Sequence, residues 1–330
     1  MNPNRRKVLF IRWCTVAAAL LFFSPQALLA ARTVVTFAFD DGYADQLTGA
    51  LILLNLGMRA TFFIPTYAIG HTGDMSVTDL QNLQTLGFEI GGHTIDHQDL
   101  TTLSPSAQQN EICGGRTILE NWGLNVVSFA YPDGAYNPSV EAVVKSCGYT
   151  SARAAWGLAC KDPGCTPGES IPPVDPYAVR TPEAVTGDTT LADLEQQVIN
   201  VEKSGGGWLP LQFHHVCEGC GQEYEITPEN LEAFAAWVQQ RASLGTTVET
   251  MNQVITYGAN PPSPGRPRPR PLPRPRNPIL LGHPSMVSSS DPEHNYVPLM
   301  SDQGQQQLQL METNPSAALS HAVQVLSITP

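Results

Sequence analysis

Two acidic residues and two histidines have the types and the spacing of a metal site. Asp40 and Asp41 follow an apolar, β-branched run at 33–39, and His93 and His97 lie four residues apart further along the chain. A catalytic zinc site typically has three protein ligands, often imidazole and carboxylate groups, and one open position. We therefore expect Asp41, His93 and His97 to bind one divalent ion. Zn²⁺ is the best match, and Co²⁺ or Ni²⁺ would fit the same ligands.

Such an ion favours hydrolysis, and two further side chains would complete that chemistry. A bound metal lowers the pKa of its water and polarises a carbonyl group. Asp40 faces away from Asp41 in an extended chain, but the turn that follows could bring it near the water as the general base. His214 directly follows an apolar run at 208–213 and is the candidate acid for the leaving group, with His215 as its rival.

Each of these motifs is weak by itself. An Asp-Asp-Gly sequence is usually a turn or a helix cap, and a His-x-x-x-His pair is most often accidental. The combination gains weight from its position, because every motif directly follows a segment with strand character.

The chain from 33 to about 258 alternates between strand and helix patterns. We expect strands at 33–39, 60–65, 88–90, 126–130, 208–213 and 246–249, and helices at 46–56, 77–86, 104–122, 138–146, 191–203 and 228–243. Repeated β-then-α units predict a parallel sheet, open or closed into a barrel. Sites in such folds form at the carboxyl ends of the strands, where the metal motifs, the turn at 132–134 and His214 all lie. The loops 66–76 and 153–176 are expected to set substrate specificity.

The charge is unevenly distributed along the 330 residues. The whole chain has a formal net charge of −12, and residues 31–258 carry 26 acidic against 9 basic residues. A domain this acidic does not suit a phosphate backbone, so we expect no nucleic-acid partner. The simplest role for the charge is solubility.

The first 30 residues have the pattern of a secretory signal peptide. A basic start at 5–7 precedes an apolar run at 16–23 and small residues around Ala30, which predicts cleavage near that residue and a secreted or periplasmic protein. A twin-arginine signal or an uncleaved anchor are the alternatives.

The cysteine count agrees with export, because six cysteines remain beyond the signal. An even number in an exported chain predicts disulfides, and we expect the pairs 160/165, 217/220 and 113/147. A four-cysteine zinc site is the alternative.

The composition changes near residue 259. Proline and arginine alternate through 278, which predicts an extended linker, and 279–330 has too little apolar surface for a core, which predicts a disordered tail. The basic linker could also tether the protein to an anionic cell wall.

Four motifs together resemble the polysaccharide deacetylases, also called carbohydrate esterase family four or the NodB-homology group. They lie at 39–42, 93–97, 129–134 and 211–214, and the resemblance covers about 33–258. It implies a distorted (β/α) barrel and a monomer acting on an acetylated polysaccharide. It also implies Asp40 as base, Asp41, His93 and His97 as ligands, and His214 as acid.

The resemblance further implies that the backbone N–H of Asp133 binds the oxyanion. Two departures stand out. The position that often carries an arginine to orient the base is Ala130, and Arg180 is the candidate replacement. Asp175 is the candidate to orient the catalytic histidine.

The function that follows is removal of N-acetyl groups from N-acetylhexosamine units of a chitin-, peptidoglycan- or poly-N-acetylglucosamine-like polymer. Because the motifs do not separate amide from ester, an O-acetyl esterase acting on xylan-type glycans is an alternative. A catalytically inactive carbohydrate-binding relative is another.

Overall fold

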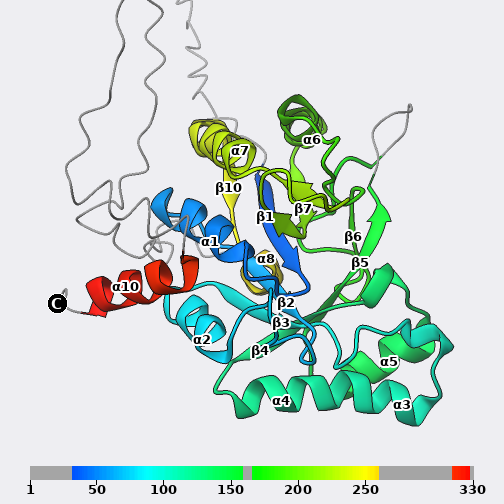
Figure 1. Cartoon of the computed structure of the whole chain (residues 1–330). Coiled ribbons are helices and arrows are strands. Elements are labelled where there is room, and N and C mark those ends of the chain that lie inside the picture. Colours follow the sequence, from blue (N-terminus) through cyan, green and yellow to red (C-terminus); the bar gives the residue numbers. More distant parts are fainter. Residues whose placement is uncertain (1–31, 159–165, 260–313, 328–330) are drawn as a thin grey trace, which may run out of the picture. The chain divides into compact units, whose positions relative to one another are not determined.

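A curled parallel sheet determines where the strand ends meet (Figure 1). The computed structural model describes residues 32–158, 166–259 and 314–327. Eight strands pair in parallel: β1 (Thr33–Asp40), β2 (Thr61–Ile64), β3 (Glu89–Gly92), β4 (Val126–Ala130), β5 (Ser151–Gly157), β6 (Val179–Thr181), β7 (Gly207–Phe213) and β10 (Thr246–Val248). The order is β10-β1-β2-β3-β4-β5-β6, and β7 also pairs with β1. A separate pair, β8 (His215–Val216) and β9 (Glu225–Ile226), follows β7.

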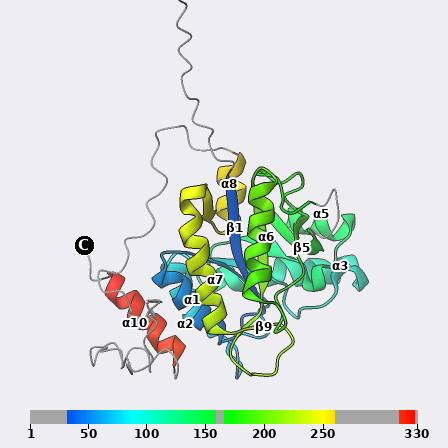
Figure 2. The same cartoon turned by 90° about the horizontal axis from the view of Figure 1, so that it is seen from above.

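Helices connect the strands, and most of them cover the outer face of the sheet, whereas α8 packs on its inner side. They are α1 (Gln46–Asn55), α2 (Val77–Thr85), α3 (Pro105–Gln109), α4 (Gly115–Asn121), α5 (Pro138–Ser146), α6 (Leu191–Lys203), α7 (Pro228–Gln240), α8 (Met251–Ala259) and α10 (Pro315–Ser327). A π-helical segment, Asn110–Gly114, joins α3 to α4, and short 3-10 turns lie at Leu100–Thr102, Pro132–Gly134 and Arg241–Leu244. Figures 1 and 2 show α6 and α7 side by side along β1 and β7.

The alternation of side chains along β1 separates the two faces of the sheet. Val35, Phe37 and Phe39 belong to the large core between the sheet and its helices. Val34 and Ala38 face the inside of the curl, where they pack with Trp208 and with Met251 and Val254 of α8. Asp40, two residues beyond Ala38, therefore lies on the inner face, and it is only 2% exposed.

A single glutamate bridges the two ends of the curl. The backbone of Glu169 pairs with that of Trp208 in β7, at 2.7 and 2.8 Å. Its carboxylate accepts from the backbone N–H of Arg180 in β6 and from the guanidinium at 2.8 and 2.9 Å. Because β6 and β7 form no ladder with each other, Glu169 links the two edges and makes the sheet a distorted barrel.

The expected α/β architecture is confirmed, and every predicted strand has a counterpart. Four strands were not predicted: β5 falls partly in the predicted loop 153–176, and β6, β8 and β9 have only two or three residues each. The predicted helix 104–122 is interrupted by its π segment. The disulfides Cys113–Cys147 and Cys217–Cys220 are present, whereas the predicted pair 160/165 lies outside the described residues.

The structure describes the two ends of the chain only in part. The predicted signal, the linker and most of the tail lie outside the described residues. Within the segment predicted to be disordered, α10 is a helix whose Leu319 is buried in the main core. No helix in the described part of the chain is long and apolar enough to span a membrane.

Candidate metal centre and active site

The backbone at the end of β1 brings two adjacent carboxylates to one site. Asp40 is the last residue of the strand, and Asp41 has a left-handed φ of 77°. This conformation is rare for a residue with a side chain and is typical of functional sites. The Asp41 N–H donates to the carbonyl of Phe63 at 3.1 Å, which holds the turn against β2. The left-handed residue is thus Asp41 itself, in addition to the glycine that follows it.

The two predicted histidines, His93 and His97, lie at distances from Asp41 that suit the ligands of one metal ion. Asp41 Oδ1 lies 3.7 Å from His93 Nε2 and 3.5 Å from His97 Nε2. Tetrahedral ligands about 2.0–2.2 Å from an ion lie roughly 3.3–3.6 Å from one another. One divalent ion therefore fits between these three side chains with little movement.

The loop that carries both histidines is held by its own hydrogen bonds. Thr94 and His97 are left-handed, at φ 71° and 53°, and Thr94 Oγ1 accepts from the backbone N–H of His97 at 2.9 Å. The buried carboxylate of Glu111, in the π segment, accepts from the N–H groups of Ile95 and Asp96 at 3.0 and 2.9 Å. The sequence interpretation did not identify Glu111, which lies in a helix and not at a strand end.

His93 is prepared to be a ligand. Its Nδ1 donates to the carbonyl of Ala130 at 2.7 Å, so Nε2 presents its lone pair toward Asp41. An outer hydrogen bond of this kind fixes the tautomer of a metal-binding histidine. Burial lowers the pKa of His93 to about 4, despite opposing effects of nearby Asp40 and Asp41, and the ring is therefore neutral at pH 7.

The proposed base is held by a buried arginine. Asp40 Oδ2 accepts from Arg153 Nη2 at 2.5 Å and from Gln212 Nε2 at 2.8 Å. Asp40 Oδ1 has no hydrogen-bond partner among the described residues. Burial alone would raise the pKa of Asp40, but the charge and hydrogen bond of Arg153, together with His93 and His214, outweigh burial and the pKa is lowered. Asp40 is therefore ionised, with one oxygen fixed and the other available.

The prediction that Arg180 takes this contact is wrong. Arg180 forms a two-point ion pair with Glu169 at the seam of the barrel, whereas Arg153 on β5 reaches Asp40. Asp175, predicted to orient the catalytic histidine, is exposed and accepts from the backbone N–H of Tyr177 instead.

The two histidines after β7 have different surroundings. His214 Nε2 lies 4.0 Å from Asp41 Oδ2, and its buried Nδ1 has no hydrogen-bond partner among the described residues. His215 Nδ1 instead lies 2.8 Å from Asp45 Oδ2, and its ring stacks on Tyr43 with centroids 3.8 Å apart. This arrangement favours His214 over His215 as the acid.

The side chains of Asp40, Asp41, His93, His97 and His214 line one large cavity of about 1380 Å³. Asp133, at its wall, is left-handed with φ 52° in a 3-10 turn that begins at Pro132. Trp156, also left-handed and 56% exposed, lies at the same wall. The wall carries carboxylates and imidazoles, with no lysine or arginine among the described residues that form it: Asp40, Asp41, His93, His97, Asp133, Glu183, Asp188, Asp193, His214, His215 and Glu223.

Residues 30–152 match a family model described as polysaccharide deacetylase. This segment is therefore similar to the polysaccharide deacetylases. The matched segment includes Asp40, the three candidate ligands and Asp133, whereas Arg153 is the first residue after it and His214 lies well beyond it.

Three known proteins show what this chain is similar to. A protein of Bacillus subtilis (strain 168), YxkH, named as a polysaccharide deacetylase, is 32% identical over 117 residues, which are 35% of this chain and 42% of that protein. The peptidoglycan-N-acetylglucosamine deacetylase of Bacillus cereus is 27% identical over 125 residues, 37% of this chain and 57% of that protein. The chain thus matches about half the length of these relatives. A solved structure, the Xyl-CE4 domain of a multidomain xylanase from the hindgut metagenome of Trinervitermes trinervoides, is 18% identical with a TM-score of 0.45, over 69% of this chain and 92% of that one.

Proposed function

We propose that this protein is a metal-dependent hydrolase that removes N-acetyl groups from N-acetylhexosamine units of a polysaccharide. The observation that carries the proposal is the convergence of one carboxylate and two imidazoles, 3.5–3.7 Å apart, beside an ionised Asp40 with a free oxygen. The matching family model supports the reaction class.

The residues have separate roles in this reaction. A divalent ion held by Asp41, His93 and His97 would supply an acidified water and polarise the acetyl carbonyl. Asp40 Oδ1 accepts the proton of the attacking water, and the Asp133 N–H donates to the developing oxyanion. His214 then protonates the departing amine, which leaves a free amino sugar and acetate.

The cavity supports a neutral or amine-bearing glycan as the substrate. Its wall has carboxylates but no fixed cation among the described residues, and it would repel an anionic polymer. The exposed indole of Trp156 offers a flat apolar surface for a sugar ring. Secretion and attachment to a cell wall through the basic linker are part of the same proposal and rest on sequence patterns alone.

Acetate release tests the function. The purified full chain should release acetate from N-acetylated chito-oligosaccharides, lose activity with a chelator and regain it with Zn²⁺ or Co²⁺. His97→Ala should be inactive, whereas His71→Ala, which removes an exposed histidine outside the cavity, should remain active.

Other outcomes distinguish the alternatives. Release only from O-acetylated xylo-oligosaccharides would make the protein an esterase. Binding of glycans without release from any acetylated substrate would make it a carbohydrate-binding relative. Activity that ignores the chelator would contradict the metal site.

A further inference from the structure

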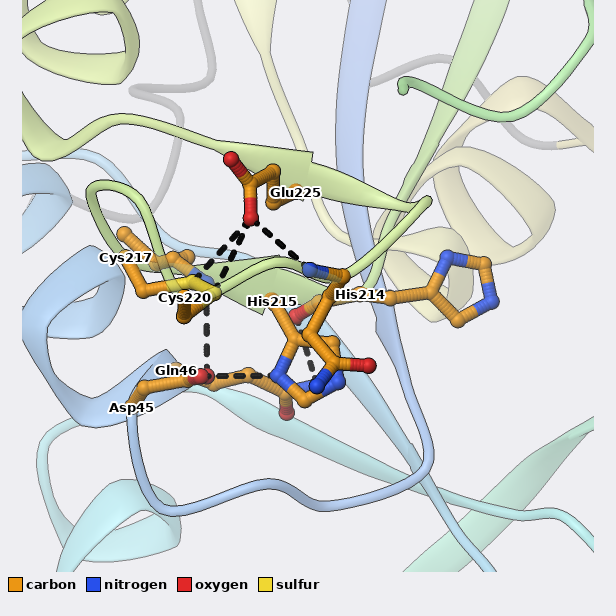
Figure 3. The surroundings of a disulfide bond; sticks show 9 residues. Asp45, Gln46, His214, His215, Cys217, Cys220 and Glu225 are labelled. Carbon is orange, nitrogen blue, oxygen red and sulfur yellow. Dashed lines mark hydrogen bonds and ion pairs between the residues drawn. A yellow bond between two sulfur atoms is a disulfide. The ribbon is translucent and has the colours of Figure 1, made fainter. Parts of the chain in front are cut away.

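A second cluster of metal-binding groups lies beside the active site, in the segment that follows His214. Cys217 and Cys220 form a disulfide in the structure, and Glu225 faces both sulfurs (Figure 3). Glu225 Oε2 lies 3.1 Å from Cys220 Sγ and 4.0 Å from Cys217 Sγ. In Figure 3 the ring of His214 points away from this cluster, and its Nε2 lies 4.0 Å from Asp41 Oδ2.

The backbone brings these side chains together. β8 and β9 pair so that His215 lies opposite Glu225, and Cys217 N–H donates to the carbonyl of Ile226 at 3.1 Å. Between the strands, Gly219 and Gly221 have left-handed φ values of 63° and 72°, a conformation that glycine adopts without cost. The resulting tight turn presents both sulfurs to the same carboxylate.

A neighbouring set of groups shares one of these sulfurs. Asp45, His215 and Cys217 have ligand atoms within 4.8 Å of one another, and so do Cys217, Cys220 and Glu225. The imidazole of His215 is oriented by Asp45 at 2.8 Å. Thiolates three residues apart in a Cys-x-x-Cys sequence, with an imidazole and carboxylates nearby, are typical donors for Zn²⁺. No residue of this cluster belongs to the catalytic ligand set.

We propose that reduction of the Cys217–Cys220 disulfide creates a second zinc site. Cys217, Cys220 and Glu225 are three of its ligands, and the His215–Asp45 pair supplies the fourth donor. The oxidised protein would bind one zinc ion and the reduced protein two. The inference is independent of the proposed deacetylase activity, because it predicts metal binding by residues outside the reaction.

The chemistry balances with a phosphine reductant. The S–S bond breaks, each sulfur takes up one proton and two electrons reach the sulfur pair, while the phosphine becomes a phosphine oxide with oxygen from water. The two thiols then lose their protons to solvent as the thiolates bind Zn²⁺.

Metal content measured on the full chain tests this proposal. The protein is equilibrated with ZnCl₂, with or without a water-soluble trialkylphosphine, desalted and analysed for zinc. We expect one equivalent in the oxidised and two in the reduced wild type. Cys217→Ser/Cys220→Ser should bind one equivalent in both states, whereas the matched control Cys113→Ser/Cys147→Ser should still gain the second on reduction. His93→Ala should bind none when oxidised and one when reduced, which separates the two sites.

Two further measurements test the proposal even if Cys217→Ser/Cys220→Ser does not fold. Glu225→Gln should weaken the second equivalent by more than the ~10–100-fold that loss of an outer-shell partner costs. Co²⁺ added to the reduced wild type should show sulfur-to-cobalt charge-transfer absorption that is absent from the oxidised protein. Equal zinc content in reduced and oxidised wild type would overturn the proposal, and so would a second equivalent that survives loss of Cys217 and Cys220.

Discussion

The buried pair of Arg153 and Asp40 gives a prediction with a defined magnitude. The two side chains are 1% and 2% exposed, and their charged atoms lie 2.5 Å apart. Arg153→Met keeps much of the apolar stem but removes the charged guanidinium, whose central carbon lies 5.3 Å from the centroid of the Phe63 ring. Leaving one buried charge unpaired typically costs about 3–5 kcal/mol. The hydrogen bond that Gln212 donates to Asp40 remains, so we expect a loss of about 3 kcal/mol, at the lower end.

A double-mutant cycle measures the coupling energy between Arg153 and Asp40. The free energy of urea unfolding is measured at pH 7 for the wild type, Arg153→Met, Asp40→Asn and the double variant. Because Asn carries no charge to leave unpaired, the double variant should be more stable than the sum of the single losses, by at least about 1.5 kcal/mol. Losses that add within about 0.5 kcal/mol, as for independent sites, would refute the coupling.

The same substitution should alter the pH dependence of catalysis. Arg153 is the main influence that lowers the pKa of Asp40 against the effect of burial. Without it the pKa rises, and the acidic limb of kcat/KM should move to higher pH. Arg180→Met is the matched control, because it breaks the ion pair with Glu169 and does not touch Asp40. An acidic limb that shifts equally in both variants would contradict the role of Arg153.

Three other predictions follow from the site and the core. His93→Ala should lose the catalytic zinc equivalent; unchanged metal content in the oxidised protein would contradict ligation. Trp156→Ala should raise KM for oligosaccharides roughly fivefold, the equivalent of ~1 kcal/mol for an aromatic contact, with little change in kcat; an unchanged KM would exclude sugar stacking. Burial raises the pKa of Glu89, so its stabilising contribution is present below pH 4.5 and is lost as the pH rises through the folded pKa. The free energy of urea unfolding of Glu89→Gln should therefore rise relative to that of the wild type between pH 4 and pH 7. A difference between the two proteins that does not change with pH would contradict this.

The clustering of Asp41, His93 and His97 was predictable because it depends on rules that are local in sequence. Parallel strands carry functional groups at their carboxyl ends, so an acidic pair after one strand and two histidines after another converge. The structure brings Asp41, His93 and His97 together as that rule requires. The alternation of β1 also explains why Asp40 faces the inside of the curl.

The partner of the base was not predictable from the same rules. Arg153 lies on β5, whose sequence of Ser, Ala and a few larger residues has weak strand character. Its contact with Asp40 spans 113 positions, and no pattern in either segment indicates the other. Arg180 was the candidate that the sequence analysis named. Its ion pair with Glu169, which links β6 to β7, shows why Arg180 does not reach Asp40.

Backbone conformation was the other missing information. Asp41, Thr94, His97 and Asp133 are all left-handed, although none is a glycine. Sequence patterns assign this conformation mainly to glycine and asparagine. The positions of these turns could therefore be predicted, but their backbone conformations could not.

The hydrogen bonds that hold the three ligands have a consequence for how the protein matures. Ala130 anchors the ring of His93, Thr94 anchors the backbone of His97, and Phe63 anchors that of Asp41. All three anchors are supplied by the sheet and its loops, and none needs an ion. Unlike a zinc finger, which is unfolded without its metal, this chain should reach its native state first and acquire the cation afterwards. Metal-free protein should therefore be reconstituted simply by dialysis, and exchanging zinc for cobalt should require no refolding.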